Sequence, residues 1–290
     1  MQKVLITGAS GFVGSRFVRR WDNDYILLTP SHSELDITDA RSVDEFFLQN
    51  TPQVVIHLAA ISNTGLCEQN PELSHRVNVE GAVNVASAAA RYGAKMIFFS
   101  SDQVYNGNRE SGPLDEDVAL SPVNVYGKDK LEAEERVLAV SPTAVVLRAT
   151  WMYDREREGM LTHANFVVNI VKATKERSQL VFPVREYRGI TWVRDVVEYL
   201  PLTFSLPGGV YNYGAGAAMN TYEVACCYCE MLVGLHAGPV IVPDYERYPE
   251  HERNLSMNID KIFRSSGGTI YFGSTMDGLR IFTEMEECLR

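Results

Sequence analysis

Tyr126 and Lys130 stand four residues apart in a segment that reads as a helix. Both side chains therefore project from the same helical face. A free tyrosine has a pKa of about 10, which is too high for ready proton exchange at neutral pH. A lysine ammonium a few ångströms away favours the phenolate and lowers that pKa. The pair predicts a general acid that can protonate a carbonyl oxygen.

Ser101 is the third candidate for this chemistry, because it follows an apolar run that reads as a strand. Its hydroxyl can donate a hydrogen bond to an oxygen that develops negative charge. Taken singly, each feature has a plainer interpretation: Ser101 as a polar strand end, and the charged run 129–136 as an exposed helical face. Their order along the chain, a strand end followed by one helix, favours a catalytic set of Ser101, Tyr126 and Lys130.

A glycine-rich loop joins the first predicted strand to the first predicted helix, with Gly8, Gly11 and Gly14 in GxxGxxG spacing. Gly8 permits a tight turn, Gly11 lets a pyrophosphate approach the backbone, and Gly14 allows the helix to pack closely on the strand. The helix N-terminus offers N–H groups and a positive dipole end to phosphates. A plain turn is the alternative, but the strand–loop–helix order favours a nicotinamide dinucleotide site.

These residues need a scaffold, and the first half of the chain predicts one. Unbroken apolar strands that alternate with helices indicate a parallel sheet covered on both faces. The expected fold class is α/β, with a Rossmann-like doubly wound parallel sheet. The expected strands are Lys3–Thr7, Tyr25–Thr29, Gln53–His57, Ala94–Ser100 and Thr143–Ala149, and the expected helices are Phe12–Trp21, Ala40–Asn50, Pro71–Tyr92 and one from Ser121-Pro122 to near Pro142.

The second half is less regular and predicts a smaller C-terminal substrate lobe. We expect residues 1–150 to form the dinucleotide-binding core, with later returns to it near 178–213. Residues 151–290 are expected to form mainly a substrate-binding lobe over the carboxyl edge of the sheet. The expected elements are helices Leu161–Glu176, Thr191–Leu200, Tyr222–Leu232 and Met276–Leu289, and strands Gln179–Phe182 and Gly209–Tyr213.

The composition is that of an ordinary globular protein, with 46% hydrophobic and 22% charged residues over 290 positions. The formal net charge of -10 disfavours nucleic acid as a partner, because an acidic surface repels a phosphate backbone. No apolar run is long enough for a membrane span or a signal peptide, so a cytoplasmic location is expected. Cys226 and Cys229 form a CxxC without a second pair at metal-site spacing. We therefore expect them to be small buried side chains, and we expect no metal site.

The GxxGxxG spacing resembles the loop of the short-chain dehydrogenase/reductase superfamily, in its extended branch. Three further segments carry the resemblance: 35–39 after the second strand, 57–60 after the third, and the YxxxK of Tyr126 and Lys130. The resemblance implies NADP(H) or NAD(H) as the cofactor, and it gives Lys130 a second role, a hydrogen bond to the nicotinamide ribose. The cofactor-binding residues that it implies are Gly8, Ser10, Gly11, Phe12, Val13, Gly14, Asp36, Ile37, Leu58, Ala59, Ala60, Asn78, Ser100, Tyr126 and Lys130.

The residues after Ser101 narrow this resemblance. Sugar-nucleotide 4,6-dehydratases carry Thr-Asp-Glu, with the Glu as base, whereas Gln103 of this chain cannot remove a proton. The stretch is similar to that of dTDP-4-dehydrorhamnose reductases, which carry Ser-Thr-Asp and then an aromatic residue. The resemblance covers nearly the whole chain and implies an NAD(P)H-dependent reductase of a 4-keto nucleotide sugar, a small-molecule substrate. The substrate-binding residues that it implies are Asp102, Trp151 and Arg253.

Two alternatives stay open. One is a nucleotide-sugar 4-epimerase of the same branch, which would hold NAD through each cycle. The other is a non-catalytic NADP-binding partner, because the regulatory subunit of methionine adenosyltransferase resembles the same reductases. A homodimer is as compatible with the sequence as a monomer, and the residues determine neither the sugar nor the nucleotide.

The end of the second predicted strand bears on the choice of cofactor. An acidic residue there would bind a ribose 2′-hydroxyl. The stretch Thr29-Pro30-Ser31-His32 has none, and Arg16 is the nearest candidate cation. The missing acid favours NADP(H).

Overall fold

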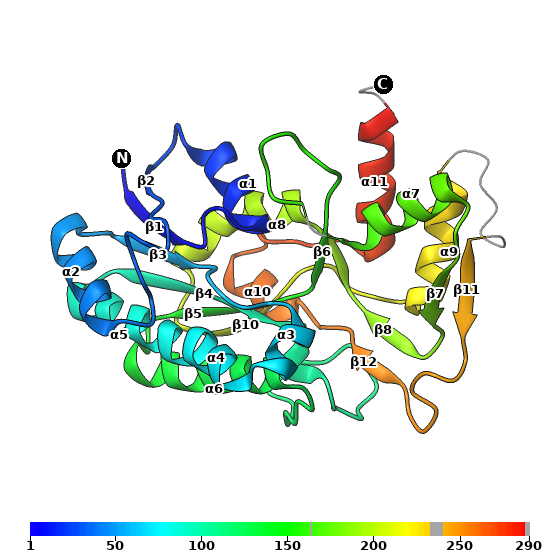
Figure 1. Cartoon of the computed structure of the whole chain (residues 1–290), viewed down its shortest axis with the longest axis horizontal. Helices are drawn as coiled ribbons and strands as arrows, with labels where there is room; N and C mark the ends of the chain where they lie inside the picture. The colour runs from blue at the N-terminus through cyan, green and yellow to red at the C-terminus, as the bar shows by residue number, and fades with distance from the viewer. Residues whose placement is uncertain (163, 233–239, 288–290) are drawn as a thin grey trace.

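Six parallel strands form one central sheet in the computed structural model of the chain, which describes residues 1–162, 164–232 and 240–287 (Figure 1). The strand order is β10-β5-β4-β3-β1-β2. The strands are β1 (Lys3–Thr7), β2 (Ile26–Leu28), β3 (Val54–His57), β4 (Lys95–Ser101), β5 (Val145–Ala149) and β10 (Gly209–Tyr213). The predicted α/β class and doubly wound parallel sheet are confirmed. Because β2 and β3 flank β1, the winding reverses at β1, which is where open α/β sheets bind ligands.

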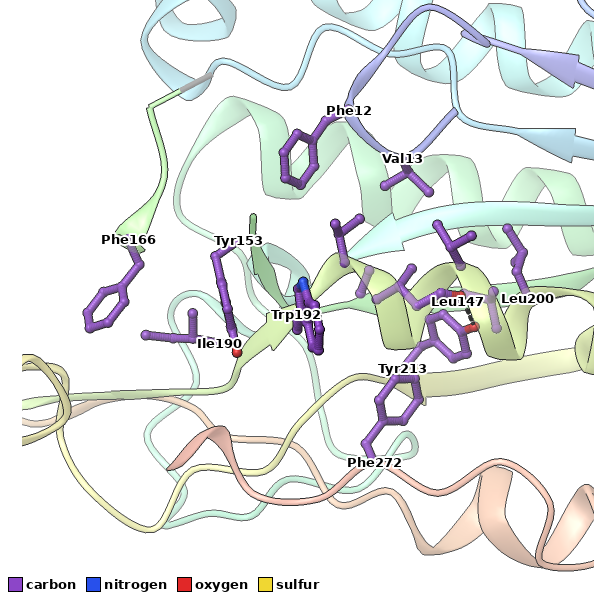
Figure 2. Close-up of a cluster of buried hydrophobic side chains, with 14 of the residues drawn as sticks. Phe12, Val13, Leu147, Tyr153, Phe166, Ile190, Trp192, Leu200, Tyr213 and Phe272 are labelled. Carbon is purple, nitrogen blue, oxygen red and sulfur yellow. Dashed lines mark hydrogen bonds between the residues drawn. The ribbon is translucent and has the colours of Figure 1, made fainter. Parts of the chain in front are cut away.

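Helices cover both faces of this sheet, and strand side chains alternate between the two faces because successive residues point to opposite sides. Leu5 and Phe98 pack in one apolar cluster with α2, α5 and α6. Ile6 and Leu147 pack in another with α1 and α8 (Figure 2). These helices are α1 (Phe12–Trp21), α2 (Ala40–Asn50), α5 (Gly81–Tyr92), α6 (Val125–Val140) and α8 (Val193–Tyr199). Burial of each large apolar side chain contributes about 1.5–3 kcal/mol, so the two clusters hold the strand ends in place.

Asparagine side chains set the start of two helices later than predicted. Asn124 accepts a hydrogen bond from a first-turn N–H of α6, and Asn165 does the same for α7 (Phe166–Glu176). An N-cap side chain of this kind satisfies an N–H that has no partner within the helix. The predicted starts at Ser121 and Leu161 are therefore wrong, and the segments before each cap are loops that reach the site.

The helix predicted over Pro71–Tyr92 contains a wider turn. It runs as α4 (Pro71–His75), a π-helical turn over Arg76–Glu80, and α5. Asn78 lies in the π-helical turn, where its side chain bonds both the N–H and the carbonyl of Ile61. Insertions of this kind are frequent at functional sites, and this one holds the loop that follows β3. A short helix ahead of it, α3 (Thr64–Gln69), was not predicted.

The lobe beside the carboxyl end of the sheet is built from very short strands, drawn at the right of Figure 1. They form three two-stranded parallel pairs, of which the sequence predicted only one strand, β7. The pairs are β6 (Trp151–Tyr153) with β9 (Ile190–Trp192), β7 (Leu180–Pro183) with β11 (Ile241–Asp244), and β8 (Glu186–Arg188) with β12 (Arg253–Leu255). The predicted helix start at Thr191 is wrong, because Thr191 belongs to β9.

Three more helices follow in the described C-terminal half: α9 (Thr221–Met231), α10 (Asp260–Ser265) and α11 (Thr275–Glu287). Of these, α10 packs against β10 of the central sheet, and the other two belong to the lobe. The predicted end of the last helix at Leu289, and Cys288 with it, lie outside the described residues. In the ranges that the structure covers, no helix combines the length and the apolar character needed to cross a membrane.

Candidate active site

A cavity of about 1080 Å³ lies where the carboxyl ends of the sheet strands meet the lobe. It brings most of the predicted site residues together. Those that line it are Gly8, Gly11, Phe12, Val13, Gly14, Leu58, Ala60, Ser100, Ser101, Asp102, Tyr126, Lys130, Trp151 and Arg253. The glycine loop and the predicted proton-transfer residues therefore open into one space.

The glycine loop has the close-packed backbone that a dinucleotide site needs. Gly8 has a φ of +72°, and a Cβ there would lie 2.8 Å from the backbone nitrogen of Ala59. A Cβ on Gly14 would lie 2.4 Å from the carbonyl oxygen of Gly8. Gly11 is the N-cap of α1 and has no side chain with which to cap it, so the start of the helix is open to a phosphate. These residues fit the pyrophosphate of NADP(H) or NAD(H), and the nicotinamide would be the hydride carrier of the site.

Five predicted cofactor-binding residues do not line the cavity. They are Ser10, Asp36, Ile37, Ala59 and Asn78. Two of them have clear structural tasks: the Asp36 carboxylate accepts from the backbone and the side chain of Thr38, which lowers its pKa, and Asn78 holds Ile61. Direct contact between these five and a cofactor stays a prediction.

Ser101 and Tyr126 both line the cavity, at the end of β4 and the start of α6. Ser101 Oγ donates to Asp102 Oδ1 at 3.2 Å and accepts from the backbone N–H of Gln103 at 3.2 Å. Tyr126 is 8% exposed. Burial raises its pKa above the usual value and the Asp102 carboxylate raises it further, while a hydrogen bond with Ser101 works in the opposite direction. The phenol therefore holds its proton at neutral pH.

Lys130 differs from its prediction in one respect. Its ammonium donates to the carbonyl oxygen of Phe99 at 2.8 Å and lies 5.8 Å from the centroid of the Tyr126 ring. Burial lowers the pKa of Lys130 to about 8. The net pKa of Tyr126 is raised and not lowered as expected, because desolvation of the buried phenol is its largest cause.

A buried ion pair below these residues fixes their positions. Arg148 of β5 donates to Glu134 of α6, with Nη2 and Oε2 2.8 Å apart. The Ser100 hydroxyl donates to the same carboxylate. The pair therefore ties together β4, β5 and α6, and two of these elements carry Ser101 and Tyr126.

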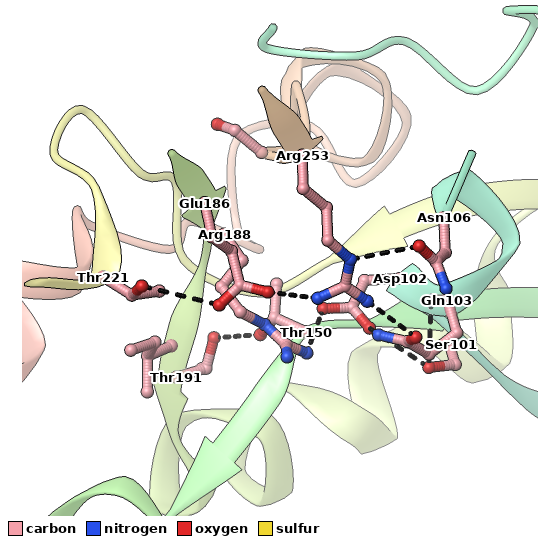
Figure 3. Close-up of polar contacts among 12 residues, drawn as sticks. Ser101, Asp102, Gln103, Asn106, Thr150, Glu186, Arg188, Thr191, Thr221 and Arg253 are labelled. Carbon is pink, nitrogen blue, oxygen red and sulfur yellow. Dashed lines mark hydrogen bonds and ion pairs between the residues drawn. The ribbon is translucent and has the colours of Figure 1, made fainter. Parts of the chain in front are cut away.

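On the lobe side, Asp102 pairs with Arg188 of β8 at 2.6 Å between Oδ2 and Nη2 (Figure 3). The guanidinium of Arg188 also lies over the ring of Trp151, 5.1 Å from its centroid. Trp151 is half-buried, lines the cavity and packs edge-on against Phe166. The two predicted substrate-binding residues Asp102 and Trp151 thus lie next to each other, joined by an arginine that the sequence did not single out.

Arg253 of β12 lines the same cavity from the lobe. It donates to Gln103 Oε1 and to Asn106 Oδ1, each at 3.0 Å, and pairs with Glu186 of β8 (Figure 3). Glu186 and Arg188 were missed because β8 is only three residues long. The one signal for them was the Glu-Tyr-Arg order, which places both charges on one face of an extended segment.

Two expectations about cofactor choice change. Arg16 is buried and pairs with Asp154 at 2.7 Å, so a carboxylate of the chain already balances its charge. The carboxylate missing from 29–32 is supplied by Glu34, which folds back and accepts from both the N–H and the hydroxyl of Ser31 at 2.8 Å. These hydrogen bonds lower the pKa of Glu34, so a negative charge lies at the end of β2.

Metal-binding side chains do not gather in the described part of the chain: it holds no group of three or more His, Cys, Asp or Glu that could bind an ion. Cys226 and Cys229 are free thiols on α9. Cys229 is buried, and burial raises its pKa to about 11.

Comparison with known proteins agrees with this geometry. A model of the RmlD substrate binding domain family matches residues 1–252. The dTDP-4-dehydrorhamnose reductase of Aggregatibacter actinomycetemcomitans is 27% identical over 283 residues, which cover 92% of this chain and 94% of the relative. Methionine adenosyltransferase 2 subunit beta of Xenopus tropicalis is 30% identical over 256 residues, which cover 82% of this chain and 75% of the relative.

A solved structure of a dTDP-4-dehydrorhamnose reductase from Bacillus anthracis, in complex with NADP, is 25% identical and aligns with a TM-score of 0.83. The alignment covers 98% of this chain and 99% of that one. The family match, the full-length relatives and the shared architecture lead to one conclusion: the chain belongs to the RmlD substrate binding domain family, within the extended short-chain dehydrogenase/reductases.

Proposed function

We propose that this chain is an NAD(P)H-dependent reductase of a 4-keto nucleotide sugar. The observation that carries the proposal is the single cavity shared by the glycine loop, Ser101 and Tyr126. A cofactor bound on Gly11 would bring its nicotinamide toward Tyr126, since both line that space. Reductases of this kind are among the full-length relatives, and one solved relative holds NADP.

The residues of the chain supply the proton side of the reaction. A bound nicotinamide would supply the hydride that reduces the carbonyl carbon, and the carbonyl oxygen would need a proton from the protein. Tyr126 suits this step because its raised pKa keeps the phenol protonated until an alkoxide forms beside it. Ser101 can donate a hydrogen bond to the same oxygen. Lys130, with a pKa near 8, carries the charge that stabilises the phenolate left behind.

The test is NADPH or NADH oxidation with dTDP-4-dehydrorhamnose and with other 4-keto nucleotide sugars. We expect turnover with at least one of them. Purified protein without bound dinucleotide fits a reductase, whereas tightly retained NAD with no net oxidation would favour the 4-epimerase alternative. No turnover with any 4-keto sugar would contradict the proposal.

A non-catalytic role is the second candidate, because methionine adenosyltransferase 2 subunit beta is as similar to this chain as the reductases are. The presence of Ser101, Tyr126 and Lys130 in one cavity favours catalysis. Absent turnover together with tight NADP binding and a stable complex with a methionine adenosyltransferase would favour the regulatory role. A homodimer stays a prediction, and light scattering of the purified chain tests it.

A further inference from the structure

Gln103 occupies an unusual place in the cavity wall. It is 7% exposed, and all of its side-chain polar atoms have partners. Its Nε2 donates to Asp102 Oδ1 at 3.1 Å, while its Oε1 accepts from Asn124 at 3.1 Å and from Arg253 at 3.0 Å. A buried amide with every group paired is held in one orientation, because each alternative would leave a buried donor or acceptor unpaired.

Each partner of Gln103 leads to a different part of the site. Asp102 accepts a hydrogen bond from the Ser101 hydroxyl, so the first contact reaches the group proposed to hold the substrate oxygen. Asn124 is the N-cap of the helix that carries Tyr126, so the second reaches the proton donor. Arg253 comes from β12, so the third reaches the lobe across the cavity (Figure 3).

From these contacts we propose that Gln103 is a positioning residue: it couples Arg253 of the lobe to the orientation of Ser101 and Tyr126. The inference rests on the proposed function and deepens it. A substrate that binds Arg253 fixes the position of a guanidinium that is hydrogen-bonded to Gln103. The Gln103 amide is then held in place, and with it the side chains of Asp102 and Asn124. The chain thereby links substrate occupancy to the alignment of its own proton-transfer groups.

Asn106 provides a matched control. Its Oδ1 accepts from Arg253 at 3.0 Å, as Gln103 does, and it is similarly buried. Its side chain makes no hydrogen bond to Asp102 or Asn124 among the described residues. The variants Gln103→Met and Asn106→Ala therefore both loosen Arg253, but only the first also releases the catalytic groups.

We expect Gln103→Met to lower kcat by about 10- to 100-fold, since a misplacement near 1 Å can cost about 100-fold. Asn106→Ala should raise KM and keep kcat within about twofold of wild type. Calorimetry with NADPH should give the wild-type Kd for both variants, which shows that the fold is intact. A Gln103→Met enzyme with wild-type kcat would overturn the proposal, and so would an equal loss of kcat in Asn106→Ala.

A double-mutant cycle tests the coupling itself. Arg253→Met should lower kcat in the wild type but not in the Gln103→Met background, because the path to Ser101 and Tyr126 is already broken. Independent, multiplicative losses would overturn the coupling.

If wild-type protein reduces no 4-keto nucleotide sugar, the proposed function fails, and the coupling is then measured as dTDP affinity by calorimetry. Gln103→Met should weaken dTDP binding only while Arg253 is present. An unchanged Kd for dTDP in Gln103→Met would contradict the coupling, whether or not the protein is a reductase.

Discussion

The two walls of the cavity differ in composition: one is mainly backbone, and the other is mainly charged side chains. On the sheet side the wall is main chain, where Gly8 and Gly14 bring backbone against backbone. On the lobe side it is a network of charged side chains, in which Arg188 and Arg253 are each held by a carboxylate. The first wall depends on residues that are neighbours in the sequence, whereas Asp102 and Arg188 stand 86 positions apart. Local constraints can be read along the chain, and distant pairings cannot.

The largest expected effect lies where the two walls meet. Tyr126→Phe removes the proton donor and keeps the ring, so kcat should fall by about 100- to 10,000-fold while the Kd for NADPH stays near wild type. Steady-state kinetics and calorimetry measure the two quantities. Full turnover in the variant would mean that another group protonates the substrate.

A substitution in the backbone wall should act mainly by weakening cofactor binding. A Cβ on Gly11 already lies 3.1 Å from the carbonyl oxygen of Gly8, and a branched side chain there also enters the cavity. Gly11→Val should weaken NADPH binding by about 100-fold or more, which corresponds to about 2.8 kcal/mol. Gly216→Val is the control, because a Cβ on Gly216 meets nothing within 4 Å. Normal titration of Gly11→Val with NADPH would show that the loop is an ordinary turn.

The dependence of kcat on pH tests the role of Lys130, which is buried beside the cavity. Lys130 loses its charge as pH rises through about 8, so kcat should decline above that pH by up to about tenfold per unit. The unfolded chain binds the proton up to the usual pKa of 10.5, so the free energy of unfolding should rise between these two values. Lys130→Arg, which stays charged, should remove the decline even if its rate is lower. An unchanged decline in Lys130→Arg would assign it to another group.

The smallest effect concerns cofactor choice. Glu34 places a carboxylate where its absence had favoured NADP(H), so we predict that this carboxylate weakens NADP(H) binding slightly. Glu34→Gln should tighten NADP(H) only a few-fold, because the site is exposed and solvent screens the charge, and it should leave NAD(H) unchanged. Calorimetry with both cofactors decides it. Loss of NAD(H) affinity in the variant would instead indicate that Glu34 binds the ribose.

The sequence predicted the site correctly where a motif reflects a local backbone conformation. Gly8, Gly11 and Gly14 each have a steric reason for lacking a side chain, and a steric reason is visible in one residue at a time. Ser101 ends a predicted strand and Tyr126 begins the next predicted helix. In an open α/β sheet such positions lie at the same edge, so the sequence predicted that the two residues are close.

The sequence was silent where position depends on partners. Glu34 lies two positions beyond residues 29–32, and only the fold-back of its side chain onto Ser31 places the carboxylate at the end of β2. Arg188 sits on a strand too short to show an alternating pattern. The pKa of Tyr126 depends on how deeply the ring is buried, and spacing along a helix carries no information about burial.

The pairing of Arg16 with Asp154 has a consequence for protein engineering. Arg16 belongs to the helix after the glycine loop and Asp154 to the segment that enters the lobe, yet both are buried and paired, and Asp154 also pairs with Arg157. A chimera that takes its first 150 residues from one relative and the remainder from another would inherit half of the pair. A chimera that keeps Arg16 and loses Asp154 leaves a buried guanidinium without its carboxylate, which costs about 3–5 kcal/mol, a large part of the stability of a typical domain. Grafts of the lobe should therefore carry position 16 with them.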